Sequence, residues 1–178
     1  MTKTPPIITA TQATPTDADA VLDLLVDAAR WIQSTGIAQW ERFRSYTSAA
    51  REEVEEAIAR SETYLFRQGD QAVGTISLAP PGDWDRNLWG AAEAEEALFV
   101  HRLAVARSAA GQGIGGIMLD WATAQARAVG VRHLRLDCVG ENAALNAYYG
   151  QRFAFKGQSP ARGALFSKYE RVLAEAAD

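Results

Sequence analysis

The amino-acid sequence predicts one domain of the α+β, or mixed α/β, class spanning residues 1–178. Its length suits a single hydrophobic core. Some apolar residues alternate with a period of two and others recur at helical spacing, so both strands and helices are expected. These segments follow one another as strand, two helices, three strands, helix, strand, helix and final strands. Early consecutive strands followed by a strand–helix–strand arrangement indicate a mixed sheet.

The first third of the chain predicts one strand and two helices. Residues 7–13 form the strand, and a helix begins at Thr16 with acidic residues in its first turn, where the helix dipole favours them. Gly36 ends that helix, and residues 36–46 are irregular. A second helix covers residues 48–59, and its acidic run is interpreted as a solvated face.

The middle of the chain predicts a hairpin, a loop and a strand. Residues 63–67 and 72–79 form two strands joined at Gly69-Asp70, which is a hairpin signal. Pro80-Pro81-Gly82 breaks the second strand. The polar, Ala-rich residues 83–95 are expected to be a long loop, and residues 97–105 form the next strand.

The last part alternates helices and strands. A helix is expected over residues 113–129, followed by a half-buried strand over 131–138, in which Leu134, Leu136 and Cys138 alternate with polar residues. A short helix covers 142–151. The final strands lie around 153–156 and 164–172.

Composition excludes several classes of protein. The formal charge is −4, with basic residues scattered along the chain, so a nucleic-acid partner is not expected. One cysteine and two histidines give neither a disulfide nor a Cys- or His-rich metal site, so no metal is predicted. The sequence shows neither a signal peptide nor a run apolar enough to span a membrane. We therefore expect a cytoplasmic protein with no membrane partner.

Four glycines lie within six residues, between a predicted strand and a predicted helix; they are Gly111, Gly113, Gly115 and Gly116. Glycines allow consecutive backbone N–H groups to turn toward one point, and a helix N-terminus adds unpaired donors. The segment therefore predicts a phosphate or pyrophosphate site. No Gly-Lys-Ser/Thr follows, which argues against nucleoside triphosphate hydrolysis.

A dinucleotide-binding oxidoreductase is the first alternative. Gly111, Gly113 and Gly116 satisfy G-x-G-x-x-G, and Asp137 follows near the end of a later strand. In such a unit, however, the first glycine closes the strand directly, whereas residues 106–110 intervene here. The chain also lacks the alternating strand–helix units of a doubly wound sheet.

Two segments together resemble the GNAT superfamily of N-acetyltransferases. Ala110-Gly111-Gln112-Gly113-Ile114-Gly115 is similar to the family's pyrophosphate loop, with Ala110 in place of the usual Arg or Gln. The segment 141–149, ending in Tyr148-Tyr149, is similar to the family's Asn-x-x-(Ala/Leu) helix and its tyrosine. The resemblance implies a twisted, mostly antiparallel mixed sheet of six to seven strands, flanked by about four helices, with a splayed strand pair that holds the cofactor.

The resemblance also implies a reaction, in which an acetyl group passes from acetyl-CoA to a primary amine of a small molecule or peptide within a ternary complex. A non-catalytic acyl-CoA-binding module remains a further alternative, and a homodimer is common in the family. The residues that the resemblance assigns to cofactor binding are Leu103, Ala104, Val105, Ala110, Gly111, Gln112, Gly113, Ile114, Gly115, Gly116, Asn142 and Tyr149.

Three residues are candidate catalysts. Tyr149, or else Tyr148, would protonate the leaving thiolate, and only one of the two can face the cofactor because neighbouring helical residues point about 100° apart. His101 is a candidate base for the incoming amine. Glu95, Glu96 and Asp137 are alternative bases. Cys138 would permit an acyl-enzyme, but is interpreted as a buried strand residue.

Overall fold

The computed structural model describes residues 7–173 and confirms the predicted fold class. Within these residues, seven strands are hydrogen-bonded in the order β1-β2-β3-β4-β5-β7-β6, with six α-helices between them. The strands are β1 (Ile8–Gln12), β2 (Thr63–Gln68), β3 (Gln71–Ala79), β4 (Ala97–Val105), β5 (His133–Val139), β6 (Ala154–Ala161) and β7 (Ala164–Val172). The helices are α1 (Ala18–Ser34), α2 (Ser48–Ala59), α3 (Asp83–Trp89), α4 (Ala91–Ala94), α5 (Ile114–Val129) and α6 (Ala143–Gly150).

The described residues fall into two compact units. The first contains the residues up to Ser77 together with Arg102–Met118, and the second contains Leu78–His101 together with the residues from Leu119 onward. The boundaries fall inside β3, β4 and α5. The single-domain count stays a prediction.

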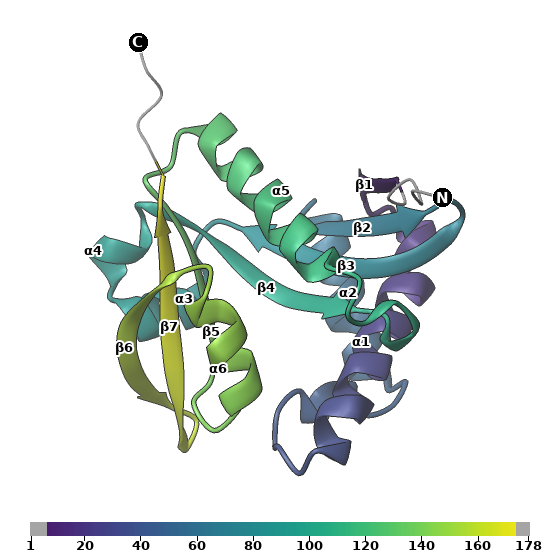
Figure 1. Ribbon diagram of the computed structural model, residues 1–178, viewed down its shortest axis with the longest axis horizontal. Coiled ribbons are helices and arrows are strands. Elements are labelled where there is room, and N and C mark those ends of the chain that lie inside the picture. The colour runs from purple at the N-terminus through teal and green to yellow at the C-terminus, as the bar shows by residue number, and fades with distance from the viewer. Residues whose placement is uncertain (1–6, 174–178) are drawn as a thin grey trace, which may run out of the picture. The chain divides into compact units, whose positions relative to one another are not determined.

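The first unit contains the N-terminal strands. β1 pairs with β2 and β2 with β3, both antiparallel, so the three strands run side by side (Figure 1). The backbone N–H of Ala106, just after β4, donates to the carbonyl of Val73 on β3 at 2.9 Å. α1 and α2 contact each other, and the Thr47 side chain caps α2 by accepting from the N–H of Ala50 at 3.1 Å.

The acidic run on α2 is a solvated face, with one exception. Glu53 is half-buried and binds Arg42 at 2.7 Å and Arg102 at 2.9 Å. Burial raises the pKa of Glu53, but the hydrogen bonds from the two guanidinium groups outweigh it, so the pKa lies below its ordinary value. Glu53 therefore acts as an anchor for the last part of β4.

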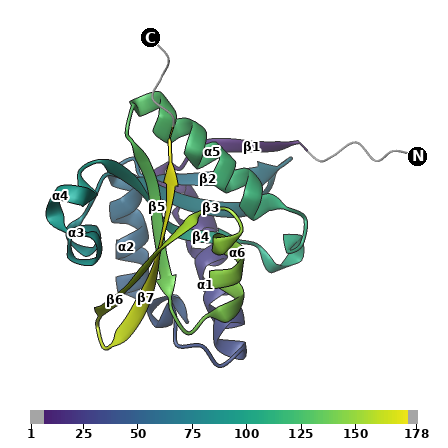
Figure 2. The ribbon, with the colours of Figure 1, turned by 60° about the vertical axis from the view of Figure 1, so that its left-hand side comes forward.

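The second unit contains the C-terminal strands. β5 pairs antiparallel with β7. β7 also pairs antiparallel with β6, and these two strands form the yellow-green hairpin in Figure 2. β4 runs parallel to β5, but the ladder between them covers only Ala97–Phe99 and His133–Arg135. β6 is longer than the sequence predicts. It forms the sheet edge, where Pro160 is tolerated because its missing N–H breaks no ladder.

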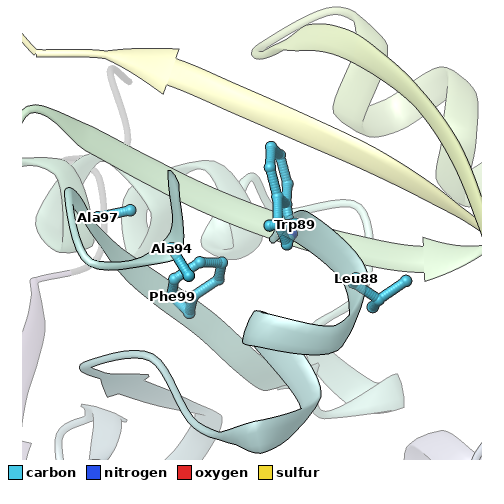
Figure 3. Packing of buried hydrophobic residues seen from close by; sticks show 5 residues of the cluster. All are labelled: Leu88, Trp89, Ala94, Ala97 and Phe99. Carbon is cyan, nitrogen blue, oxygen red and sulfur yellow. The ribbon is translucent and has the colours of Figure 1, made fainter. Parts of the chain in front are cut away.

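The prediction of a loop over residues 83–95 is wrong, because α3 and α4 occupy this segment. The N–H of Gly82 donates to Asp85 Oδ2 at 2.9 Å, which caps the start of α3. Leu88 and Trp89 then pack with Ala94, Ala97 and Phe99 in one buried cluster (Figure 3). A seven-residue helix has little stability alone, so this packing stabilises it.

The expected alternation along β5 holds for Leu134, Leu136 and Cys138, all buried, but not for Arg135. The Arg135 guanidinium lies 4.6 Å from the ring centroid of Trp89, and its Nε donates to Glu170 at 2.8 Å. Because α3 covers the second face of the strand, Arg135 is buried as well. In the part of the chain that the structure describes, no helix has the length and apolar character to cross a membrane.

Candidate functional site

The glycine segment joins β4 to α5 in the first unit. After β4, a short 3-10 helix (Arg107–Ala109) leads to Ala110, and α5 begins at Ile114. Gly111 and Gly113 both have a φ of +77°, and a Cβ atom at either position would have nothing within 4 Å. The chain therefore needs glycine here for its backbone conformation rather than to relieve a clash inside the protein.

This geometry suits an anion. Two left-handed glycines directly before a helix N-terminus form the kind of backbone concavity in which N–H groups bind phosphate. The start of the segment is anchored to α1, because the N–H of Arg107 donates to Asp27 at 2.9 Å. The guanidinium of Arg107 also stacks 3.9 Å from the ring centroid of Trp31. Leu103, Ala104, Val105, Ala110, Gln112, Gly115 and Gly116 lie in the same strand–loop–helix segment.

β4 contains an irregularity directly before Leu103. Arg102 has a φ of +49°, a left-handed conformation that an arginine rarely adopts. Its guanidinium holds it in place, since Nε donates to Ser77 Oγ at 3.1 Å and Nη1 to Glu53 at 2.9 Å. Within β4, an anchored residue in an uncommon backbone conformation therefore directly precedes residues 103–105.

The second unit contains the predicted tyrosines. Asn142 is buried and caps α6, its Oδ1 accepting from the N–H of Leu145 at 3.1 Å. Tyr149 is buried, with its ring 5.9 Å from that of Tyr169, whereas Tyr148 is half-buried under the guanidinium of Arg152 at 4.1 Å. Burial raises the pKa of both tyrosines, so both hydroxyls carry a proton at neutral pH.

His101 contacts a carboxylate that the sequence did not single out. Its Nε2 lies 3.2 Å from Asp85, which is only 2% exposed. Asp137 is close by, and one polar atom from each of the three side chains lies within 4.8 Å of the others. Of the alternative bases, Glu95 binds Arg86 at 2.8 Å, and Glu96 faces His133 at 3.8 Å.

Cys138 is buried, as expected. Burial, with a smaller effect from Asp137, raises the pKa of its thiol to about 12. The thiolate needed for an acyl-enzyme is therefore scarce at neutral pH.

The structure brings the predicted residues together in two groups. The strand–loop–helix segment lies in the first unit; Asn142, Tyr148, Tyr149 and His101 lie in the second. Sequence reasoning missed Asp85, although Gly82-Asp83-Trp84-Asp85 carries the acidic first turn of a helix start.

A glycine segment between a strand and a helix N-terminus, on an antiparallel-rich sheet with a short parallel pairing of β4 and β5, is a geometry suited to a phosphate-bearing ligand outside the doubly wound class. The sheet thereby excludes the dinucleotide-binding alternative. The model of the acetyltransferase (GNAT) family matches residues 25–155. The chain belongs to this family and is an acetyltransferase.

Relatives agree with this assignment. The chain is 32% identical over 154 residues to YesJ of Bacillus subtilis, an uncharacterised N-acetyltransferase, covering 85% of this chain and 84% of YesJ. A GNAT-family acetyltransferase from Listeria monocytogenes has a TM-score of 0.77 at 29% identity, covering 93% of this chain and 95% of the other. The PaiA N-acetyltransferase of Thermoplasma acidophilum, solved with coenzyme A, has a TM-score of 0.71 at 16% identity, covering 91% and 98%.

Proposed function

We propose that the chain transfers an acetyl group from acetyl-CoA to a primary amine of a small molecule or peptide, by direct attack in a ternary complex. The observation that carries the proposal is the pair of left-handed glycines, Gly111 and Gly113, directly before α5. Family membership and the coenzyme A bound to the PaiA neighbour support acetyl-CoA as the phosphate-bearing molecule.

Different residues of the chain bind the cofactor, orient its thioester and transfer protons. The loop from Ala110 to Gly116 holds the pyrophosphate, and the backbone of Leu103–Val105 orients and polarises the thioester carbonyl. Asn142 contacts the cofactor in addition to capping α6. Acetyl-CoA supplies an activated thioester. Tyr149, with Tyr148 as the alternate, protonates the departing sulfur, and His101 takes a proton from the amine.

Thermal unfolding tests cofactor choice. At one hundred times its Kd, acetyl-CoA stabilises the folded state by about 2.7 kcal/mol, which raises the Tm of a chain this size by roughly 5–11 °C. NADH at the same concentration leaves the Tm unchanged. A rise with NADH and none with acetyl-CoA contradicts the proposal.

An acceptor screen separates an enzyme from an acyl-CoA-binding module. Primary amines of differing charge and lysine-containing peptides are offered with acetyl-CoA, and released coenzyme A is measured. A binding module raises its Tm with acetyl-CoA but releases no coenzyme A with any amine. Longer acyl-CoA donors, offered with the best acceptor, show whether the donor is limited to acetyl.

A further inference from the structure

Three ionisable side chains from three elements converge in the second unit. Asp85 lies on α3, His101 on β4 and Asp137 on β5. Nε2 of His101 is 3.2 Å from each oxygen of the Asp85 carboxylate. The imidazole therefore directs one particular nitrogen toward a buried carboxylate.

The cap of α3 provides a hydrogen bond for one oxygen of the Asp85 carboxylate but not for the other. Its Oδ2 accepts from the N–H of Gly82 at 2.9 Å, while its Oδ1 is buried without a hydrogen-bond partner among the described residues. A buried carboxylate oxygen without a partner is costly. The hydrogen bond with His101 Nε2 uses Oδ2, the same oxygen that caps α3, and Oδ1 also lies 3.2 Å from Nε2.

Asp137 is positioned by a tryptophan. The indole Nε1 of Trp84 donates to Asp137 Oδ2 at 3.2 Å, and the Trp84 ring packs edge-on to Phe166 with 4.9 Å between the centroids. Burial raises the pKa of Asp137, although His101 and Trp84 oppose the rise. The Arg162 guanidinium lies over the Trp84 ring, 4.9 Å from its centroid.

This arrangement fixes the tautomer of a neutral His101. A carboxylate accepts but does not donate, so Nε2 carries the proton that points to Asp85. Nδ1 is then the nitrogen with the free electron pair. The His101 side chain is 25% exposed, so an incoming molecule can reach it, while the Asp85 side chain is only 2% exposed.

We propose that Asp85 is a positioning residue that holds His101 with its proton on Nε2, so that Nδ1 removes a proton from the acceptor's ammonium group. The inference rests on the proposed acetyl transfer. The ammonium gives one proton to Nδ1 and becomes a neutral amine. The nitrogen electron pair then forms the C–N bond as the C–S pair leaves on sulfur, and the tyrosine hydroxyl protonates the thiolate. The second proton, which the new amide nitrogen loses, passes through solvent to the tyrosinate and restores its hydroxyl. Imidazolium, now beside Asp85, returns its extra proton to solvent.

Nuclear magnetic resonance tests the positioning without any acceptor, and the chain has only two histidines to resolve. We expect His101 to be the Nε2–H tautomer, and Asp85→Asn to mix the two tautomers. The control is Asp17→Asn, because Asp17 accepts the N–H of Thr14 at 2.8 Å in a similar cap within the first unit. An unchanged tautomer of His101 in Asp85→Asn overturns the inference.

Metal binding is the competing use of two carboxylates and an imidazole. Micromolar Zn²⁺ is added to the same labelled protein. No shift of the His101 signals supports the inference. Stoichiometric binding that disappears in Asp85→Asn overturns it in favour of a metal centre.

Kinetics with the best acceptor from the screen supply the second readout. Asp85→Asn lowers kcat/KM by about 10- to 100-fold and moves the acid limb of the pH profile to lower pH, with the KM for acetyl-CoA unchanged. Asp85→Asn combined with His101→Gln is no slower than His101→Gln alone, because Asp85 acts through His101. Additive losses, or an acid limb that stays in place, overturn the inference.

Failure of the proposed acetyl transfer and failure of the role given to Asp85 lead to different results. If the proposed function fails, acetyl-CoA neither raises the Tm nor releases coenzyme A, whatever the tautomer of His101. If Asp85→Asn does not fold, His101→Gln replaces it as the variant. Recovery of its activity by added imidazole supports the base at His101, and no recovery overturns it.

Discussion

Replacing Gly113 with alanine separates the cost of its backbone conformation from its role in binding. A Cβ atom at Gly113 would have nothing within 4 Å, so the substitution creates no clash. Its φ of +77° remains unfavourable for alanine, by about 1–2 kcal/mol. For a chain of this size the expected fall in Tm is therefore roughly 2–8 °C.

Gly130 provides a matched control. It has a φ of +79°, again with nothing within 4 Å of a Cβ atom, but it follows the C-terminal end of α5 rather than preceding its start. Gly130→Ala should lose the same stability as Gly113→Ala. Only Gly113→Ala should also lose acetyl-CoA affinity, because relieving its φ reorients the loop's N–H groups.

The expected loss of affinity follows from one hydrogen bond. A hydrogen bond to a charged group contributes about 1.5–3 kcal/mol, so losing one weakens Kd by roughly 10- to 150-fold. Calorimetric titration of acetyl-CoA into both variants and the native chain measures the effect, and thermal unfolding measures the stability. If Gly113→Ala loses stability yet binds acetyl-CoA like the native chain, the loop is not the pyrophosphate site.

Other substitutions test the remaining roles. Tyr149→Phe should lower kcat at least tenfold with little change in acetyl-CoA affinity; if Tyr148→Phe does so instead, Tyr148 is the acid. Cys138→Ala should retain activity, and the native thiol should resist alkylation at neutral pH; a trapped acyl-enzyme would contradict both expectations. Burial raises the pKa of Glu170, but the hydrogen bond and charge of Arg135 outweigh that effect, so the folded-state pKa lies below the ordinary value. The Glu170 carboxylate therefore stabilises the fold above its unfolded pKa, and this contribution is lost as the pH falls through the lower folded pKa. Glu170→Gln should therefore cost about 3 kcal/mol in urea unfolding at pH 7 and less near pH 3; an equal cost at both values refutes this.

The sequence predicts the larger elements because their signals are local. The alternation around Leu134 and Leu136, the helical spacing after Ile114 and the turn at Gly69-Asp70 each depend on neighbours within a few residues. Gly111 and Gly113 are also informative in the sequence alone, because glycine is the residue that most readily adopts the positive φ found at both positions.

The features that sequence reasoning missed depend on tertiary contacts. Helix α3 is only seven residues long and is stabilised by Trp89 packing on Phe99 at 6.1 Å between centroids. Arg135 looks like an exposed position of an alternating strand until Trp89 covers it. The left-handed backbone conformation of Arg102 cannot be predicted from its sequence neighbours, because it depends on an ion pair with Glu53, which is distant in the sequence.

The packing of α3 has a consequence for how this protein diverges from its relatives. The same helix that carries Asp85 also supplies Leu88 and Trp89 to a buried cluster. Exchanging the whole segment for one of another length would therefore uncover Phe99 and leave the Arg135 cation without its aromatic neighbour. Point substitutions at the exposed positions of α3 therefore disturb the protein less than a change in the length of the helix. We expect homologues that keep Asp85 and Trp89 to differ at exposed positions such as Asp83 and Asn87 more often than in the length of α3.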